Sequence, residues 1–219
     1  MSNKSILQRN SKMTKTMKLH AGYRIFNVSM PAGITCPMAG ACAKVCYAKY
    51  GRQAMPRQMA GYRENLTMYE QGVFFDQLEA ELTRQERLAA KMGQTVLIRI
   101  HDTGDFFSRE YLEDWLTFMR AHPGVWFYAY TKSVSFVKDA AISGLVPENF
   151  TYVFSYGGKQ DLLIDREHDR WAEIVPEDAE IPAGCFDGSH DDIYAADPGC
   201  RMIALRVHGA GKKYLKADA

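Results

Sequence analysis

The chain lacks any long apolar segment. None of its stretches approaches the roughly 20 consecutive apolar residues that a membrane-spanning helix needs. The first residues, Met1 to Lys4, lead into polar sequence without the apolar core of a secretory signal. We therefore expect a cytoplasmic protein with no membrane partner. Thiols stay reduced in that compartment, so the five cysteines, an odd number, are expected to be ligands rather than disulfide partners.

Acidic residues are absent from the first part of the chain. Residues 1–63 contain eleven Lys or Arg and no Asp or Glu, and the first acid is Glu64. A solvated basic face is one interpretation of this asymmetry. The other is that residues 1–63 meet something anionic, such as nucleic acid, another polyanion, a phosphate-bearing ligand or a negatively charged metal cluster.

The length of 219 residues and an ordinary globular composition favour one substantial domain, and no internal repeat is present. Residues 1–22 show no hydrophobic periodicity and are predicted to form a flexible basic arm. Residues 23–209 are predicted to form a single α/β iron–sulfur domain, followed by a basic tail at 210–219.

Strand and helix patterns alternate along that domain. Strands are predicted at 23–30, 95–100, 125–130, 150–154, 171–175 and 201–207, and helices at 56–71, 74–92, 108–121 and 134–143. Strands separated by helices imply right-handed β-α-β units and a parallel sheet. The chain is short for a closed eight-stranded barrel, which typically needs about 250 residues. The pattern therefore predicts an α/β fold, a partial (β/α) barrel of about five or six mostly parallel strands.

Three cysteines lie within eleven residues, directly after the first predicted strand. Cys36, Cys42 and Cys46 have C-x5-C-x3-C spacing. This spacing fits no common zinc knuckle, whereas an iron–sulfur cluster tolerates longer gaps because its thiolates bind different irons. We expect a 4Fe-4S cluster, with zinc or plain reduced cysteines as the alternatives. Cys185 or Cys200 is a possible fourth ligand, and a closed site of that kind would do no ligand chemistry.

Polar residues follow the other predicted strands, at the carboxyl ends where parallel α/β proteins place their chemistry. The candidate catalytic residues are Asp102, Asp105 and Lys132; the candidate cofactor-binding residues are His101, Asp102, Asp105, Lys132, Ser155, Gly157 and Lys159. A separate hypothesis takes His101, Asp102 and Asp105 as ligands of a divalent metal in a nuclease. Aspartate is also common in turns before helices, so a structural role remains open.

The strand, the three-cysteine loop and the βα order resemble the radical S-adenosylmethionine enzymes. Tyr47, after Cys46, matches the aromatic neighbour of the third cysteine there, although the usual spacing of x3 and then x2 differs from the spacing here. The resemblance implies a cluster with one iron free for S-adenosylmethionine, and an electron donor as partner. It implies that Asp102 or Asp105 receives the cofactor amine and that Lys132 or Lys159 pairs with its carboxylate. Ser155 or Gly157 would then approach the ribose.

More of the chain is similar to the gene product 88 family of phage and mobile-element proteins. The matching stretches are 36–48 (CPMAGACAKVCYA), 99–106 (RIHDTGDF), 127–132 (FYAYTK) and 154–161 (FSYGGKQD). This resemblance implies relatives and, for a phage-encoded chain, the cytoplasm of a bacterial host, but it implies no reaction.

The leading hypothesis is therefore an iron–sulfur enzyme, with radical S-adenosylmethionine-type chemistry on an unknown, possibly nucleic acid or nucleotide, substrate. One alternative is a zinc- or cluster-stabilised module that binds nucleic acid without catalysis. The other alternative is the metal-dependent nuclease that uses His101, Asp102 and Asp105.

Overall fold

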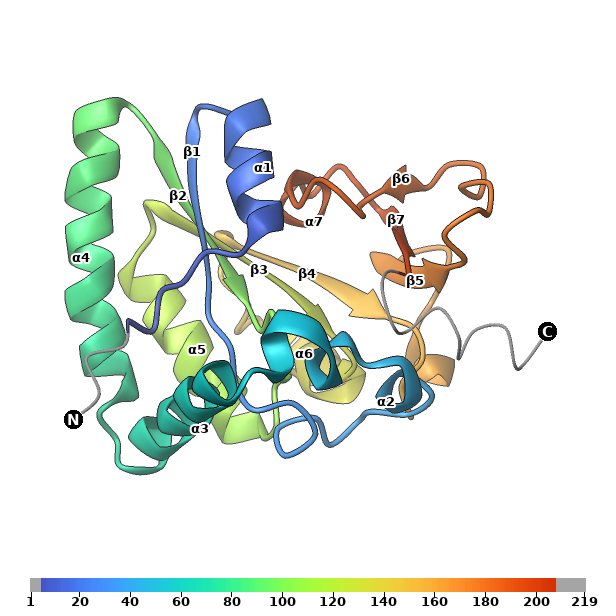
Figure 1. Cartoon of the computed structure of the whole chain (residues 1–219), viewed down its shortest axis with the longest axis horizontal. Coiled ribbons are helices and arrows are strands. Elements are labelled where there is room, and N and C mark those ends of the chain that lie inside the picture. The colour runs from blue at the N-terminus through green and yellow to red at the C-terminus, as the bar shows by residue number, and fades with distance from the viewer. Residues whose placement is uncertain (1–4, 208–219) are drawn as a thin grey trace.

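The computed structural model describes residues 5–207, so the expected tail at 210–219 and the first four residues of the expected arm lie outside the described residues. Figure 1 shows the order of the elements. The helices are α1 (Ser11–Leu19), α2 (Cys42–Val45), α3 (Pro56–Glu70), α4 (Phe74–Met92), α5 (Arg109–Ala121), α6 (Val134–Ile142) and α7 (Ile193–Ala196), and the short 3-10 helices are η1 (Tyr47–Lys49), η2 (Gly51–Ala54) and η3 (Asp161–Leu163). The strands are β1 (Tyr23–Asn27), β2 (Thr95–Ile100), β3 (Val125–Thr131), β4 (Phe150–Ser155), β5 (Trp171–Val175), β6 (Phe186–Asp187) and β7 (Met202–Arg206).

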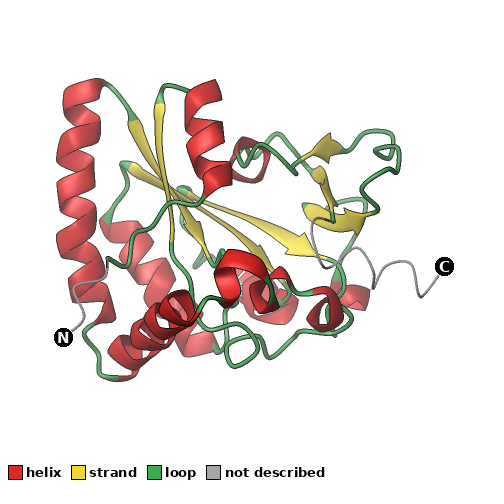
Figure 2. Ribbon diagram, in the orientation of Figure 1, coloured by secondary structure: helices red, strands yellow, loops and turns green. Residues whose placement is uncertain are grey.

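The strands form one curled sheet in the order β1-β2-β3-β4-β5-β7-β6, and every neighbouring pair is parallel (Figure 2). The expectation of a partial α/β barrel is therefore confirmed. The sheet has one strand more than expected, because the two-residue β6 lies in a turn-rich stretch that carries no strand pattern. No helix within residues 5–207 is long and apolar enough to cross a membrane.

The outer face of the sheet carries the larger hydrophobic core. Helices α4, α5 and α6 cover it, and alternate strand residues such as Val96, Ile98 and Ile100 point toward them. Trp115 and Phe127 lie fully buried at its centre, where Phe74, Phe75 and Phe118 pack edge-on around the indole. Packing on this face stabilises the sheet, whose strand ends carry the loops around the cavity described below.

The inner face has a smaller core that is closed by two helices distant in sequence. Leu97, Tyr128 and Ile203 point inward from β2, β3 and β7, and they pack with Met13 of α1 and Ala195 of α7. The partial barrel is thus closed on this side by helices instead of further strands.

The expectation of a flexible arm at 1–22 is wrong for the residues that the structure describes. Ile6 and Met13 are fully buried, and Gln8 forms an antiparallel bridge with Asn27 of β1. Asn10 caps α1 by accepting a hydrogen bond from the backbone N–H of Met13 at 2.9 Å. Only Met13 and Thr16 of this helix are buried, so its sequence has no apolar stripe that would have indicated a helix.

Candidate functional site

A cavity of about 540 Å³ opens at the carboxyl ends of the strands. Its walls come from the cysteine loop after β1, from η1, η2 and α3, and from the loops after β2, β3 and β4. The predicted residues that line it are Cys36, Cys42, Cys46, His101, Asp102, Asp105, Lys132 and Ser155. The structure therefore gathers most of the sequence-predicted residues at one place, while Gly157, Lys159, Cys185 and Cys200 are not in its lining.

One side of the cysteine loop is held against the end of β2. The backbone N–H of Met30 donates to the carbonyl of Thr103, and the Thr103 hydroxyl donates to the carbonyl of Met30, both at 2.8 Å. Gly104 has a φ of +89° and lies so close to the loop that a β-carbon there would come within 2.7 Å of Met30 Cβ and 2.6 Å of Thr35 Oγ1. Only glycine fits this contact.

The other side of the loop is held by the turn after β4. The carbonyl of Gly157 accepts hydrogen bonds from the backbone N–H groups of Gly40, at 3.2 Å, and Cys42, at 3.0 Å. Lys159 donates from its backbone to Met38 O and from Nζ to Pro37 O, both at 2.9 Å. Gly157 and Lys159 were expected to bind a cofactor, but the structure places them as supports of the cysteine loop. The Gly157 carbonyl and both Lys159 donors bond to the loop, and the backbone N–H of Gly157 donates to Asp161 Oδ2 at 2.8 Å.

The three cysteines of the loop line the same cavity. Burial raises the pKa of Cys36 to about 11, and the negative charges of Asp105, Cys46 and Cys42 act in the same direction. A backbone hydrogen bond from Gly33 opposes this rise only in part. Cys36 is therefore a neutral thiol near pH 7 unless a bound cation favours its thiolate.

Within residues 5–207, no three His, Cys, Asp or Glu side chains are placed so that they could hold a single metal ion. The two remaining cysteines lie elsewhere. Cys185 packs against the outer core, and the buried Cys200 donates from its thiol to Asp197 Oδ2 at 3.5 Å. In this structure, therefore, neither Cys185 nor Cys200 is placed to be a fourth ligand beside Cys36, Cys42 and Cys46.

His101, Asp102 and Asp105 line the cavity but do not converge on one point. His101 has a left-handed φ of +63°, its Nε2 lies 3.0 Å from the hydroxyl of Tyr111, and burial lowers its pKa to about 3. Asp105 accepts hydrogen bonds from the Thr131 hydroxyl at 2.6 Å and from the backbone N–H of Lys132 at 2.8 Å. The neutral imidazole and the internally bonded carboxylate hold β2, β3 and α5 together, so the triad required by the nuclease hypothesis is not assembled.

Lys132 extends along the cavity wall toward β4. Its Nζ donates to Ser155 Oγ at 2.6 Å and to the Ser155 carbonyl at 3.1 Å. Both side chains line the cavity, so an ammonium and a hydroxyl group stand together in its wall.

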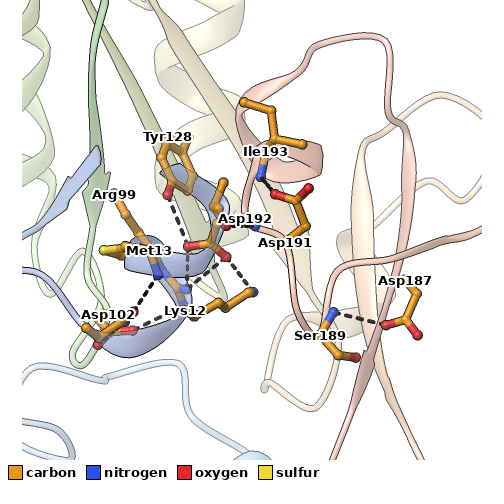
Figure 3. Close-up of polar contacts among 12 residues, drawn as sticks. Lys12, Met13, Arg99, Asp102, Tyr128, Asp187, Ser189, Asp191, Asp192 and Ile193 are labelled. Carbon is orange, nitrogen blue, oxygen red and sulfur yellow. Dashed lines mark hydrogen bonds and ion pairs between the residues drawn. The ribbon is translucent and has the colours of Figure 1, made fainter. Parts of the chain in front are cut away.

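A buried charge network that the sequence did not indicate joins α1, β2 and β3 to the residue before α7 (Figure 3). Asp192, just before α7, contacts Lys12 of α1 at 2.5 Å and Arg99 of β2 at 3.0 Å, and it accepts a hydrogen bond from the hydroxyl of Tyr128 at 3.0 Å. Burial alone would raise the pKa of Asp192, but the positive charges of Arg99 and Lys12 outweigh burial and hold this pKa well below its usual range. The signal in the sequence was Arg99, a single charge in the apolar run TVLIRI.

The model of the family described as Gene product 88 matches residues 4–217 of the chain. The chain belongs to the gene product 88 family. It is also 34% identical over 127 residues to the Gene 88 protein of Mycobacterium phage L5, a match that covers 53% of this chain and 49% of that protein. The chain thus matches about half the length of this phage relative, and no solved structure matches it. The resemblance to gene product 88 proteins is confirmed, while the S-adenosylmethionine-type organisation stays a prediction.

Proposed function

We propose that Cys36, Cys42 and Cys46 hold a 4Fe-4S cluster and that the protein is an iron–sulfur enzyme of the radical S-adenosylmethionine type. The observation that supports this most is the common cavity: three thiols from one loop line it at the carboxyl end of a parallel sheet, and the other two cysteines do not. Three protein ligands for a four-iron cluster leave one iron available to a small molecule in the cavity, and an open position characterises a catalytic site.

The spacing of the cysteines favours a cluster over zinc. The C-x5-C-x3-C pattern of Cys36, Cys42 and Cys46 fits no common zinc knuckle. The thiolates of a cluster bind different irons and therefore stand farther apart. Either zinc or the irons of a cluster would favour the thiolate of Cys36, whose pKa is raised to about 11 without a metal.

The surroundings of the loop contain basic residues that suit a cluster with net negative charge. Lys49 lines the cavity, and its Nζ donates to the carbonyl of Ala43 at 2.7 Å. Lys44 and Arg52 lie in or just after the same loop, and all three side chains are exposed, but Lys44 and Arg52 do not line the cavity. Of the three, Lys49 would therefore be the residue that offsets the charge.

When bound, the cluster would chelate the amino and carboxylate groups of S-adenosylmethionine and, with an external electron donor, reduce it. The chain's own contribution would be to bind and orient this cofactor. Lys132, with Ser155 beside it, would pair with the cofactor carboxylate. Lys159 is engaged with the cysteine loop, so the choice left open between the two lysines falls on Lys132.

We extend the proposal to an anionic substrate, of the nucleic acid or nucleotide class. The acid-free residues 1–63 supply the outer part of the cavity lining, where Lys49 and Arg63 stand with the half-exposed Tyr47 and the exposed Met59. Cations beside an aromatic ring and a thioether suit a phosphate with a stacked base.

The test is anaerobic purification and reconstitution, followed by iron and sulfide analysis and absorption spectra with and without S-adenosylmethionine. We expect a brown protein with about four irons per chain, a loss of colour in Cys42→Ala, and retained colour in the matched variants Cys185→Ala and Cys200→Ala. Colourless protein that carries zinc would instead support the non-catalytic binding module. Loss of colour in Cys200→Ala as strong as that in Cys42→Ala would contradict an open iron.

A further inference from the structure

Asp102 joins three segments that are far apart in the sequence. Its Oδ2 accepts hydrogen bonds from Asn10 Nδ2 at 3.0 Å and from Gln53 Nε2 at 2.9 Å. The hydroxyl of Tyr47 donates to the backbone carbonyl of Asp102 and lies 3.4 Å from Oδ1. Arg99 Nη2 is 3.7 Å from the same Oδ1 and ties Asp102 to the network around Asp192 (Figure 3).

Each of these contacts bears on the position of the cysteine loop. Tyr47 is the residue after Cys46, so anchoring its hydroxyl fixes the backbone next to the third thiol. Gln53 belongs to η2, through which the chain returns from the loop to α3, and it accepts a hydrogen bond from the hydroxyl of Tyr62.

The contact with Asn10 brings α1 into the same unit. Asn10 uses Oδ1 to cap α1 and Nδ2 to reach Asp102, so one side chain serves the helix and the cavity wall together. We propose that Asp102 is a positioning residue, which couples the docking of α1 to the place of Cys46 and Tyr47, instead of a ligand for the cofactor amine. The value of this coupling for catalysis rests on the proposed function, but the coupling itself is a property of the metal-free chain.

The chemistry requires an acceptor-only side chain at this position. A carboxylate accepts hydrogen bonds at both oxygens, whereas an asparagine amide would present its N–H donors either to Asn10 and Gln53 or to Arg99. Asp102→Asn therefore removes the charge and leaves at least one donor facing another donor. Adding Gln53→Glu reverses the polarity of one pair, because the new carboxylate accepts from the amide at 102 and still accepts from Tyr62.

The experiment measures thiol alkylation in the metal-free, reduced full-length chain by mass spectrometry, with Cys200 as an internal reference. Loss of one or two net hydrogen bonds corresponds to about tenfold in the opening of a segment. We expect Cys46 to react about tenfold faster in Asp102→Asn and about threefold faster in Asn10→Ser, which keeps a helix cap but cannot reach Asp102. The double variant Asp102→Asn with Gln53→Glu should return the rate to within about threefold of the wild type.

Asn149→Ala is the matched control for general loosening, because Asn149 donates to three backbone carbonyls, including those of Met119 and His122 at the far end of α5. This variant should change the alkylation rates of Cys46 and Cys200 by the same factor. The proposal would be overturned if Asp102→Asn left the ratio of the Cys46 and Cys200 alkylation rates unchanged, or if adding Gln53→Glu did not bring the Cys46 rate back toward that of the wild type. Neither result depends on iron, so failure here is distinct from failure to load a cluster.

Discussion

The two faces of the sheet are built from different chemistry. The outer face buries aromatic and aliphatic side chains around Trp115 beneath α4, α5 and α6. The inner face buries an aspartate, an arginine and tyrosine hydroxyl groups beneath α1 and α7, and it leads to the thiol-lined cavity. Apolar packing is tolerant of small rearrangements, whereas a buried charge network has one arrangement that satisfies all its members. The outer face therefore supplies stability, and the inner face fixes geometry.

The largest expected effect is on the outer face. Trp115→Ala removes a fully buried indole from the centre of the core. It should lower the free energy of unfolding by about 3–5 kcal/mol, measured by denaturant titration. Because the damage is remote from the loop, the ratio of Cys46 to Cys200 alkylation should stay near that of the wild type; a selective rise at Cys46 would mean that the two faces are not separable.

The next effect tests the inner face. Asp192→Asn leaves the cations of Lys12 and Arg99 beside a neutral partner. The substitution should lower the free energy of unfolding by about 3 kcal/mol at pH 7. The folded-state pKa of Asp192 is lowered, so its stabilisation is complete above the unfolded value of about 3.9 and is lost as the pH falls below it. Denaturant titrations at pH 7 and pH 3 should therefore show the gap between wild type and variant narrowing on acidification, and a gap of constant size would count against the ion network.

The smallest expected effect sharpens the comparison at the loop. A β-carbon on Gly40 would lie 2.9 Å from the backbone carbon of Gly158, so Gly40→Ala must push the loop away from the turn after β4. We expect the free energy of unfolding to fall by about 1–3 kcal/mol. Cys42 should also be alkylated faster, because its backbone N–H bonds to the same turn. Gly124→Ala, where nothing lies within 4 Å of the added carbon, is the control and should change neither quantity.

The sequence predicted the sheet well where each strand carries its own pattern. The runs that became β2 and β3 are apolar and β-branched or aromatic, so they indicate buried strands without knowledge of their neighbours. Helix α1 gave no such signal, because it is stabilised by Asn10, Lys12 and Met13 acting on residues far along the chain. The brief elements β6 and α7 are likewise formed by their neighbours more than by their own residues.

The location of the candidate site could be predicted from the sequence, but the contacts that each of its residues makes could not. Strand ends in a parallel sheet meet at one edge, which is why Cys36, Asp102 and Lys132 were expected together. Which atom each polar group contacts depends on partners such as Thr131 for Asp105 and Pro37 for Lys159, and spacing along the chain does not encode these pairs. The sequence therefore could not indicate that Gly157 and Lys159 bond to the cysteine loop.

The meeting of α1 with Asp192 also has a consequence for how the chain is made. Thr16 and Asp192 are 176 residues apart, yet the Thr16 side chain accepts a hydrogen bond from the backbone of Asp192 at 3.0 Å. A polypeptide emerging from the ribosome can assemble β1 to β4 and their outer helices early, but Lys12 of its first helix has no contact with Asp192 until that residue has been made. During synthesis the contact of α1 with the inner face should thus be completed after β1 to β4 have already paired.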